Sequence, residues 1–376
     1  MSLKETLTTY WLRVQHELLP WLDDTMGPLG ERHQQLVCVL GLARIEALLP
    51  NVDGLPGRPA SERAALARAF VAKAVFNFPA AVLLIEMLAA DKTPRRPRGW
   101  QRVGEVPGGA TFSRAFAASA LPSRLHEALI KESHADRLVG HISRDSTAIE
   151  AREKPAAKAE QPAPVKHRRG RPRKGEARPP APVRRIERQG GMSLAEMLAD
   201  LPRRCDVGAK RNAKGHQETW IGYKLHIDTA DGEIPISCVL TAASVHDSQV
   251  AIPLATITKA RVHNLYDLMD SAYDVAEVKQ HSRDLGHVPI INVNPRAAPG
   301  LKQELALEAK RLRTVGHRMA DQVRYGERSA AERVNGGLKD NHGGRTLRVR
   351  GAEKVMCHLM FGVLSFTAPQ LMRLVT

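Results

Sequence analysis

The chain has 376 residues, of which 43% are hydrophobic, so it can supply a core for two or three domains. Its 56 Lys and Arg exceed its 40 Asp and Glu, a formal net charge of +16 that predicts a polyanionic partner and favours nucleic acid over a membrane surface. The four cysteines lie far apart and form no CxxC pair, so they predict neither a zinc site nor a disulfide framework.

Two features predict a cytoplasmic protein. The first residues, Met1-Ser-Leu-Lys-Glu, lack the apolar core of a signal peptide. The most apolar run, 355–366, lies in a helix expected over 353–375 that should pack on the rest of the protein. This run is interrupted by His358 and followed by Pro369, so no membrane span is expected.

Residues 1–133 are predicted to form a helical N-terminal domain that binds DNA. Apolar side chains recur at helical spacing from Leu36 to Leu48, and a further helix is expected over 61–78. A basic stretch at 92–100 follows, which is either a solvated connector or a contact to DNA phosphates.

The second predicted domain, residues 134–376, begins with an apolar strand over 138–146. Asp145 stands where the apolar character of this strand breaks, and it is the only acidic residue there. A surface Asp in a turn is the alternative. We predict that Asp145 is a functional carboxylate.

A basic, Pro-rich insertion interrupts this domain. Residues 151–190 contain seven Pro, thirteen Lys and Arg and four Asp and Glu, a local net charge of +9. This composition cannot bury enough apolar surface to offset the entropy of ordering, so residues 151–205 are predicted to be largely disordered. Within them, residues 168–174 resemble an AT-hook, which places Arg side chains in the minor groove of A·T-rich DNA; a nonspecific basic linker is the alternative. The candidate DNA-binding residues are Arg169, Gly170, Arg171, Pro172 and Arg173.

The sheet is expected to resume with two strands, 219–228 and 233–242, that form a hairpin. Lys224 and His226 point to the same side of the first strand. Either could approach DNA, but we interpret them as satisfied sheet residues.

Three carboxylates accompany the next predicted strand, 264–270, and their positions distinguish them. Asp267 lies in the middle of the strand, and Asp274 has the form of a helix cap. Asp270 lies at the carboxyl end, where α/β sheets gather their functional groups, so we choose Asp270.

The residues of two predicted loops have two possible roles each. His246 and Asp247 could form a metal pair, although Asp247 as a helix N-cap is favoured. A further strand over 288–294 ends in Asn-Pro-Arg, and Arg296 is either a substrate contact or part of a turn.

A helix predicted over 326–340 carries the most specific pattern of the chain. Tyr325, Arg328, Glu332 and Lys339 are separated by three, four and seven residues, so a helix aligns them along one stripe. Such a stripe suits a phosphodiester, because the carboxylate can hold a divalent metal while the cations contact phosphates. An exposed helix with an Arg–Glu pair is the alternative.

The spacing Tyr-x2-Arg-x3-Glu-x6-Lys resembles the signature around the last acidic residue of the DDE transposases of bacterial insertion sequences. All four positions and all three gaps match. The tripeptide Asp145-Ser-Thr, and Asp270 with Tyr273 in an Asp-x-x-Tyr context, are similar to the surroundings of the two aspartates of this family.

The resemblance implies an α/β fold: a ribonuclease H-like mixed sheet flanked by helices and preceded by an all-helical N-terminal domain. It implies that Asp145, Asp270 and Glu332 are catalytic and bind two Mg²⁺ ions, for which Mn²⁺ can substitute. It also implies that Tyr325, Arg328 and Lys339 bind DNA.

The implied reaction is cleavage at the ends of the element followed by strand transfer. The implied partners are the terminal inverted repeats and the target DNA, bound by a homo-oligomer at the bacterial nucleoid. A nuclease without strand joining and a catalytically silent DNA-binding relative are the alternatives.

Overall fold

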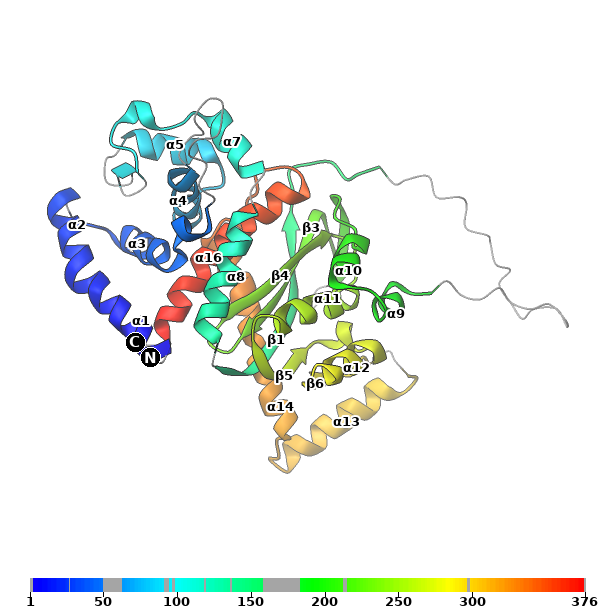
Figure 1. Cartoon of the computed structure of the whole chain (residues 1–376). Coiled ribbons are helices and arrows are strands. Elements are labelled where there is room, and N and C mark those ends of the chain that lie inside the picture. The colour runs from blue at the N-terminus through cyan, green and yellow to red at the C-terminus, as the bar shows by residue number, and fades with distance from the viewer. Residues whose placement is uncertain are drawn as a thin grey trace.

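The structure is a computed structural model, and it describes residues 3–26, 28–49, 63–90, 95–96, 99–117, 120–135, 137–157, 183–211, 215–295 and 298–374. Within these ranges the protein is a mixed α/β structure, with a six-stranded sheet flanked by helices. The N-terminal helices lie to one side of the sheet (Figure 1).

The sheet combines antiparallel and parallel strands. β3 is antiparallel to β1 and to β4, whereas β5 is parallel to β1 and to β6, which gives a mixed sheet with β1 inside it. The short β2 extends the sheet along the first half of β3. The bounds are β1 Leu138–Glu150, β2 Asp206–Arg211, β3 Gln217–Ala230, β4 Ile234–Ala242, β5 His263–Met269 and β6 Val288–Ile291. The five predicted strands are present, and β2 is an addition.

β2 escapes prediction because it is a mostly exposed edge strand. Its only large apolar side chain, Val207, is itself exposed. A strand with little buried surface needs no alternation of apolar and polar residues, which is the pattern that identifies strands in a sequence.

β1 and β3 approach each other closely at Gly222. This residue has a φ of 153°, and a Cβ atom there would lie 2.1 Å from the carbonyl oxygen of Ile149. Only glycine has room at this position, so Gly222 lets β3 remain paired with β1 as far as Glu150.

The N-terminal helices share a core with the sheet. Phe70 of α4 and Ile130 of α8 belong to the same buried cluster as Ile142 of β1 and Phe361 of α16. The predicted boundary at residue 133 therefore separates helices from strands along the sequence, but it does not separate two cores. The bounds are α1 Leu3–Arg13, α2 Leu19–Met26, α3 Glu31–Ala43, α4 Arg63–Val75, α5 Ala81–Ala90, α7 Gly109–Ala117 and α8 Leu121–His134.

The 22-residue helix α16 (Ala352–Arg373) lies between these helices and the sheet (Figure 1). Among the described residues it is the one helix long and apolar enough to span a membrane, but most of it is buried inside the protein. His358 and Pro369 were expected to limit this apolar run, but both lie inside the helix. His358 does not interrupt the helix, because its ring lies 2.8 Å from the Gly343 carbonyl oxygen and 3.0 Å from Lys73 Nζ. A helix that packs on all sides is apolar all round.

Two groups of helices cover the two faces of the sheet. α11 (Ser248–Lys259) and α12 (Ala276–Asp284) share a buried cluster with β5 on one face. α15 (Ser329–Asn341) and α16 share another cluster with β1 and β3 on the other face.

Two short helices lie within the segment predicted to be disordered. Ile186 of α9 (Arg185–Gln189) and Met197 of α10 (Leu194–Asp200) are buried in the cluster that contains α11. Arg185 also pairs with Asp200 at 2.8 Å. The prediction of disorder is therefore wrong for residues 183–205, because a few apolar residues gain stability by docking on α11.

The predicted helix over 326–340 is divided. α13 (Leu301–Thr314), which has no buried residue, leads to α14 (Ala320–Tyr325). A 3₁₀ turn at Gly326–Arg328 follows, and α15 begins at Ser329. Tyr325 and Glu332 thus belong to different helices.

Candidate active site

Asp145 and Asp270 come close together because their strands are parallel neighbours. In the register of β1 and β5, Arg144 is opposite Met269, and each aspartate directly follows one member of this pair. β5 ends at Met269, after which the Asp270 carboxylate accepts the backbone N–H of Ala272 at 2.8 Å. The two aspartates that strand position predicts therefore stand side by side at the end of β5.

Burial dominates the electrostatics of these two carboxylates. It raises the pKa of Asp145 to about 6 against the opposing charge of Arg328, and the charge of Asp270 adds to the increase. Burial also raises the pKa of Asp270, with Asp247 as a further like charge. Neighbouring desolvated carboxylates favour a proton or a cation between them.

The start of α15 lies against Asp145. The Arg328 guanidinium is 3.8 Å from Asp145 Oδ1 and donates a 2.5 Å hydrogen bond to Glu332 Oε1. Asn335 Nδ2 donates to Asp145 Oδ2 at 3.1 Å, while Asn335 Oδ1 is buried and lacks a hydrogen-bond partner among the described residues. Arg328 thus links Glu332 to Asp145.

The remaining two members of the predicted stripe differ in position. The Arg328 guanidinium lies 5.7 Å from the centre of the Tyr325 ring, so Tyr325 belongs to the same group. Lys339 lies near the far end of α15, where burial and then the charges of Lys210 and Arg345 lower its pKa. Glu150 and Asp340 act in the opposite direction on this pKa, so Lys339 lies among charges of both signs.

The donor set fits a divalent cation, although the described residues contain no preformed group of three His, Cys, Asp or Glu side chains that could hold one. Glu332 does not complete such a group with the two aspartates, because its side chain is 58% exposed and paired with Arg328. Two desolvated carboxylates and the buried, unpartnered amide oxygen of Asn335 are hard oxygen ligands of the kind that Mg²⁺ prefers. Asp145 and Asp270 would hold the cation, and Glu332 would have to leave Arg328 to join them.

Asp247 is an acidic neighbour with a structural role. It occupies the N-cap position of α11, but its side chain makes no capping hydrogen bond, contrary to the favoured interpretation. Its carboxylate instead accepts from Ser146 Oγ at 2.9 Å and from Lys224 Nζ at 3.0 Å. Lys224 is therefore a satisfied sheet residue, as predicted. His226 is satisfied only at Nε2, which lies 3.0 Å from the Thr241 hydroxyl, because its buried Nδ1 has no hydrogen-bond partner among the described residues.

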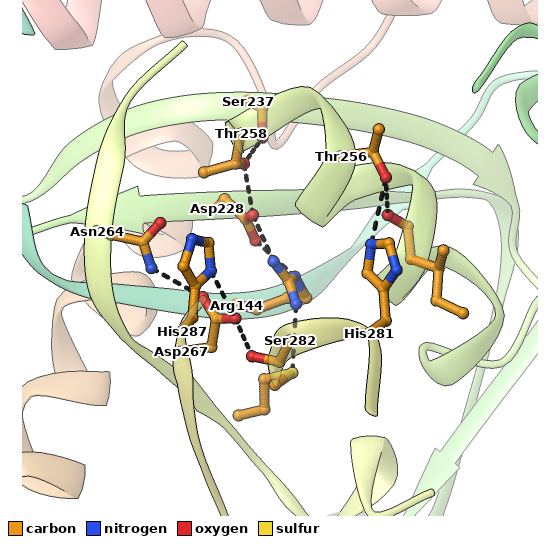
Figure 2. Close-up of polar contacts among 12 residues, drawn as sticks. Arg144, Asp228, Ser237, Thr256, Thr258, Asn264, Asp267, His281, Ser282 and His287 are labelled. Carbon is orange, nitrogen blue, oxygen red and sulfur yellow. Dashed lines mark hydrogen bonds and ion pairs between the residues drawn. The ribbon is translucent and has the colours of Figure 1, made fainter. Parts of the chain in front are cut away.

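A buried polar network surrounds Arg144, the residue before Asp145 (Figure 2). Arg144, adjacent to Asp145, donates two hydrogen bonds to Asp228 of β3, at 2.8 and 2.7 Å, and its Nη1 lies 3.4 Å from the sulfur of Met269. Thr258 of α11 donates to the same carboxylate at 2.6 Å. Arg144 therefore joins β1, β3 and β5 at the residues next to both aspartates.

Asp267 belongs to the same network, which explains how a carboxylate can be buried in the middle of β5. Its carboxylate accepts from Asn264 Nδ2 at 3.0 Å and from Ser282, and it lies 3.2 Å from His287 Nδ1 (Figure 2). Asp274 likewise has local partners, the backbone N–H of Asn294 at 2.6 Å and the Lys279 ammonium. These contacts leave Asp270 as the strand-end carboxylate without a cationic hydrogen-bond partner among the described residues.

Some predicted site residues lie outside the described ranges. These are the AT-hook-like residues and one candidate contact: Arg169, Gly170, Arg171, Pro172, Arg173 and Arg296. Conversely, sequence reasoning missed Asn335 and Arg144. Asn335 is three residues after Glu332, so helical spacing was the signal available for it.

Comparison with known proteins gives one match. A family described as "Transposase DDE domain" matches residues 140–367, which is more than half of the chain and includes Asp145, Asp270 and Glu332. No curated protein and no solved structure matches the chain. The matched residues run from β1 into the C-terminal part of α16, so they include every strand of the sheet. The chain therefore belongs to the transposase DDE-domain family, whose members are enzymes that act on DNA with divalent metal ions.

Proposed function

We propose that this protein binds the ends of a bacterial insertion sequence and catalyses Mg²⁺-dependent strand cleavage and strand transfer into target DNA. The observation that carries this proposal is the pair Asp145 and Asp270 at the end of β5, with Arg328 linking Glu332 of α15 to Asp145. The order β4-β3-β1-β5-β6, three antiparallel strands followed by two parallel ones, supports a ribonuclease H-like fold.

Asp145, Asp270 and Glu332 are the proposed ligands of two Mg²⁺ ions, with Mn²⁺ as a substitute. Bound there, these ions would supply an activated water or 3′-hydroxyl and stabilise the leaving oxygen. Asn335 holds the Asp145 carboxylate in place through its 3.1 Å hydrogen bond. The charge of this carboxylate, and not its proton, is what the reaction requires.

Arg328 can exchange its carboxylate partners for a DNA phosphate. In the structure it pairs with both Glu332 and Asp145. If Glu332 turns to a cation, the guanidinium becomes available for the two hydrogen bonds that it makes well with a phosphate. Tyr325 and Lys339 are the further proposed DNA contacts, on either side of this position.

Strand joining is the test of the proposed function. We expect the purified chain, given Mg²⁺ and a plasmid that carries the DNA flanking this coding sequence on both sides, to release the enclosed segment and to join its ends to a second plasmid. Cleavage without joined products would identify a nuclease only. Failure to cut in both Mg²⁺ and Mn²⁺ would identify a catalytically silent relative.

The AT-hook-like stretch is proposed to add affinity for A·T-rich DNA. The N-terminal helices are proposed to bind DNA as well, and the protein is proposed to act as a homo-oligomer on DNA. Deleting residues 160–181 stops short of α9, so the buried side chain of Ile186 is retained. We expect the deletion to preserve thermal stability and cleavage while weakening binding to A·T-rich duplexes on the order of tenfold.

The control for this deletion is a G·C-rich duplex of the same length, measured at the same salt concentration. A minor-groove ligand of A·T tracts should mimic the deletion on the wild-type chain. Equal losses on both duplexes would assign the stretch to nonspecific phosphate binding.

A further inference from the structure

A cationic pocket lies far along the chain from the carboxylates described above. It has a volume of about 330 Å³ and lies where α4, α5 and α7 meet the segment that leads into α16. Three of its lining residues are cations, Arg348, Arg350 and Lys354, and none of its lining residues is acidic. Lys73 also lines it, but Lys73 is buried and burial lowers its pKa to about 7. Its floor is apolar, because Phe70 and Phe112 line it and are buried.

The cations at the rim are available to a ligand. Arg348 and Arg350 are exposed and Lys354 is half-buried. Within the described ranges, no ion pair involves any of the three. Arg350 donates from Nε to the Arg152 carbonyl oxygen at 3.1 Å, a contact that fixes the side chain without neutralising it. Like charges gathered without a carboxylate are stabilised by an anion.

The start of a helix adds to this positive potential. Pro79, Ala80 and Ala81 line the pocket, and Ala81 is the first residue of the ten-residue helix α5. The first turn of α5 contains no acidic side chain that would cancel the partial positive charge of a helix N-terminus. Backbone N–H groups and cationic side chains on one pocket are the combination that holds phosphates.

We propose that this pocket binds the sugar-phosphate backbone of the duplex DNA on which the protein acts. The proposal deepens the proposed function and rests on it for the identity of the ligand. A backbone is favoured over a base, because the two aromatic rings of the floor are buried and the groups within reach of a ligand are the cations.

The pocket and the two aspartates can contact one duplex. Arg152, which accepts the hydrogen bond from Arg350, is seven residues beyond Asp145, and the strand between them extends to Glu150. At about 3.3 Å per residue, seven residues of extended chain span about 23 Å. This is about seven base-pair steps of DNA, at about 3.4 Å each. A single bound duplex is therefore long enough to reach both places.

Salt-dependent binding to a 30-base-pair duplex of mixed sequence tests the pocket, with the full chain and fluorescence anisotropy. We expect the double variant Arg348→Gln/Lys354→Gln to lower the slope of log K against log salt by about two and to weaken binding on the order of tenfold or more. Ser113→Glu, which adds a negative charge to the lining, should weaken binding without removing a cation.

The matched control removes two cations elsewhere. Arg311→Gln/Arg313→Gln alters two exposed residues of α13 and should leave the slope within about half a unit of the wild-type value. Thermal unfolding of each variant separates loss of contact from loss of fold. Equal slopes for the two double variants, or an unchanged slope for the pocket variant, would overturn the inference.

The outcome can be separated from that of the proposed function. Metal-dependent cleavage at saturating protein concentration depends on the aspartates and not on the pocket. If the pocket variants bind like the wild type while cleavage and joining occur, the pocket assignment fails and the proposed function stands. If the pocket governs binding but the chain never cuts DNA, the site stands and the proposed function fails.

Discussion

Asp145→Asn, Asp270→Asn and Glu332→Gln are each expected to slow strand cleavage by on the order of a thousand-fold or more, about 4 kcal/mol in activation free energy. An amide keeps the shape of the carboxylate but loses the negative charge that holds a hard divalent cation. Burial already raises the pKa of Asp145 and of Asp270, so an amide at either position removes a charge that burial disfavours. Thermal stability should therefore be retained or increased. The measurement is single-turnover cleavage in Mg²⁺, with DNA affinity recorded in parallel.

Matched controls lie in the same segment of the chain. Glu327→Gln and Asp321→Asn remove exposed carboxylates just before α15 and within α14, and both variants should cleave within about twofold of the wild-type rate. DNA binding should persist in all five variants. A catalytic variant that cleaves at the wild-type rate would remove that residue from the proposed metal site.

Arg144→Met is expected to destabilise the protein strongly, by about 3–5 kcal/mol in the free energy of unfolding. The Arg144 side chain is only 2% exposed, and its loss leaves the fully buried Asp228 carboxylate without its cation. The double variant Arg144→Met/Asp228→Asn should recover at least about 2 kcal/mol of this loss, because it removes both buried charges. Urea unfolding with an unchanged m-value measures these differences.

Arg345→Met is the surface control for this pair. Arg345 pairs with Asp340 on the protein surface, where such a contact contributes less than about 1 kcal/mol.

The double variant Arg144→Met/Asp228→Asn should also cleave DNA about 10- to 100-fold more slowly while folded, since the neutral pair no longer holds Asp145 and Met269 in register. Wild-type cleavage by the folded double variant would show that Arg144 supports stability alone.

The sequence by itself determined the elements that have a buried, repeating pattern. The five predicted strands are continuous apolar or alternating runs, and the two carboxylates chosen from them are Asp145, which lies inside β1, and Asp270, which directly follows β5. The spacing of Arg328 and Glu332 predicted their contact, because residues four apart in a helix lie next to each other on the same face. These features depend on neighbours within about one turn or one strand.

The tertiary structure alone decided which distant groups meet. Asp228 is 84 residues from Arg144 and Asn335 is 190 residues from Asp145, and no local pattern selects either partner. β2, α9 and α10 likewise gain their stability from the strand or helix against which they lie, and not from their own composition. A periodic pattern states which face of an element is buried. The packing of the whole chain states what lies on that face, and so it decides that Arg328, and not a third carboxylate, stands beside Asp145 in this structure.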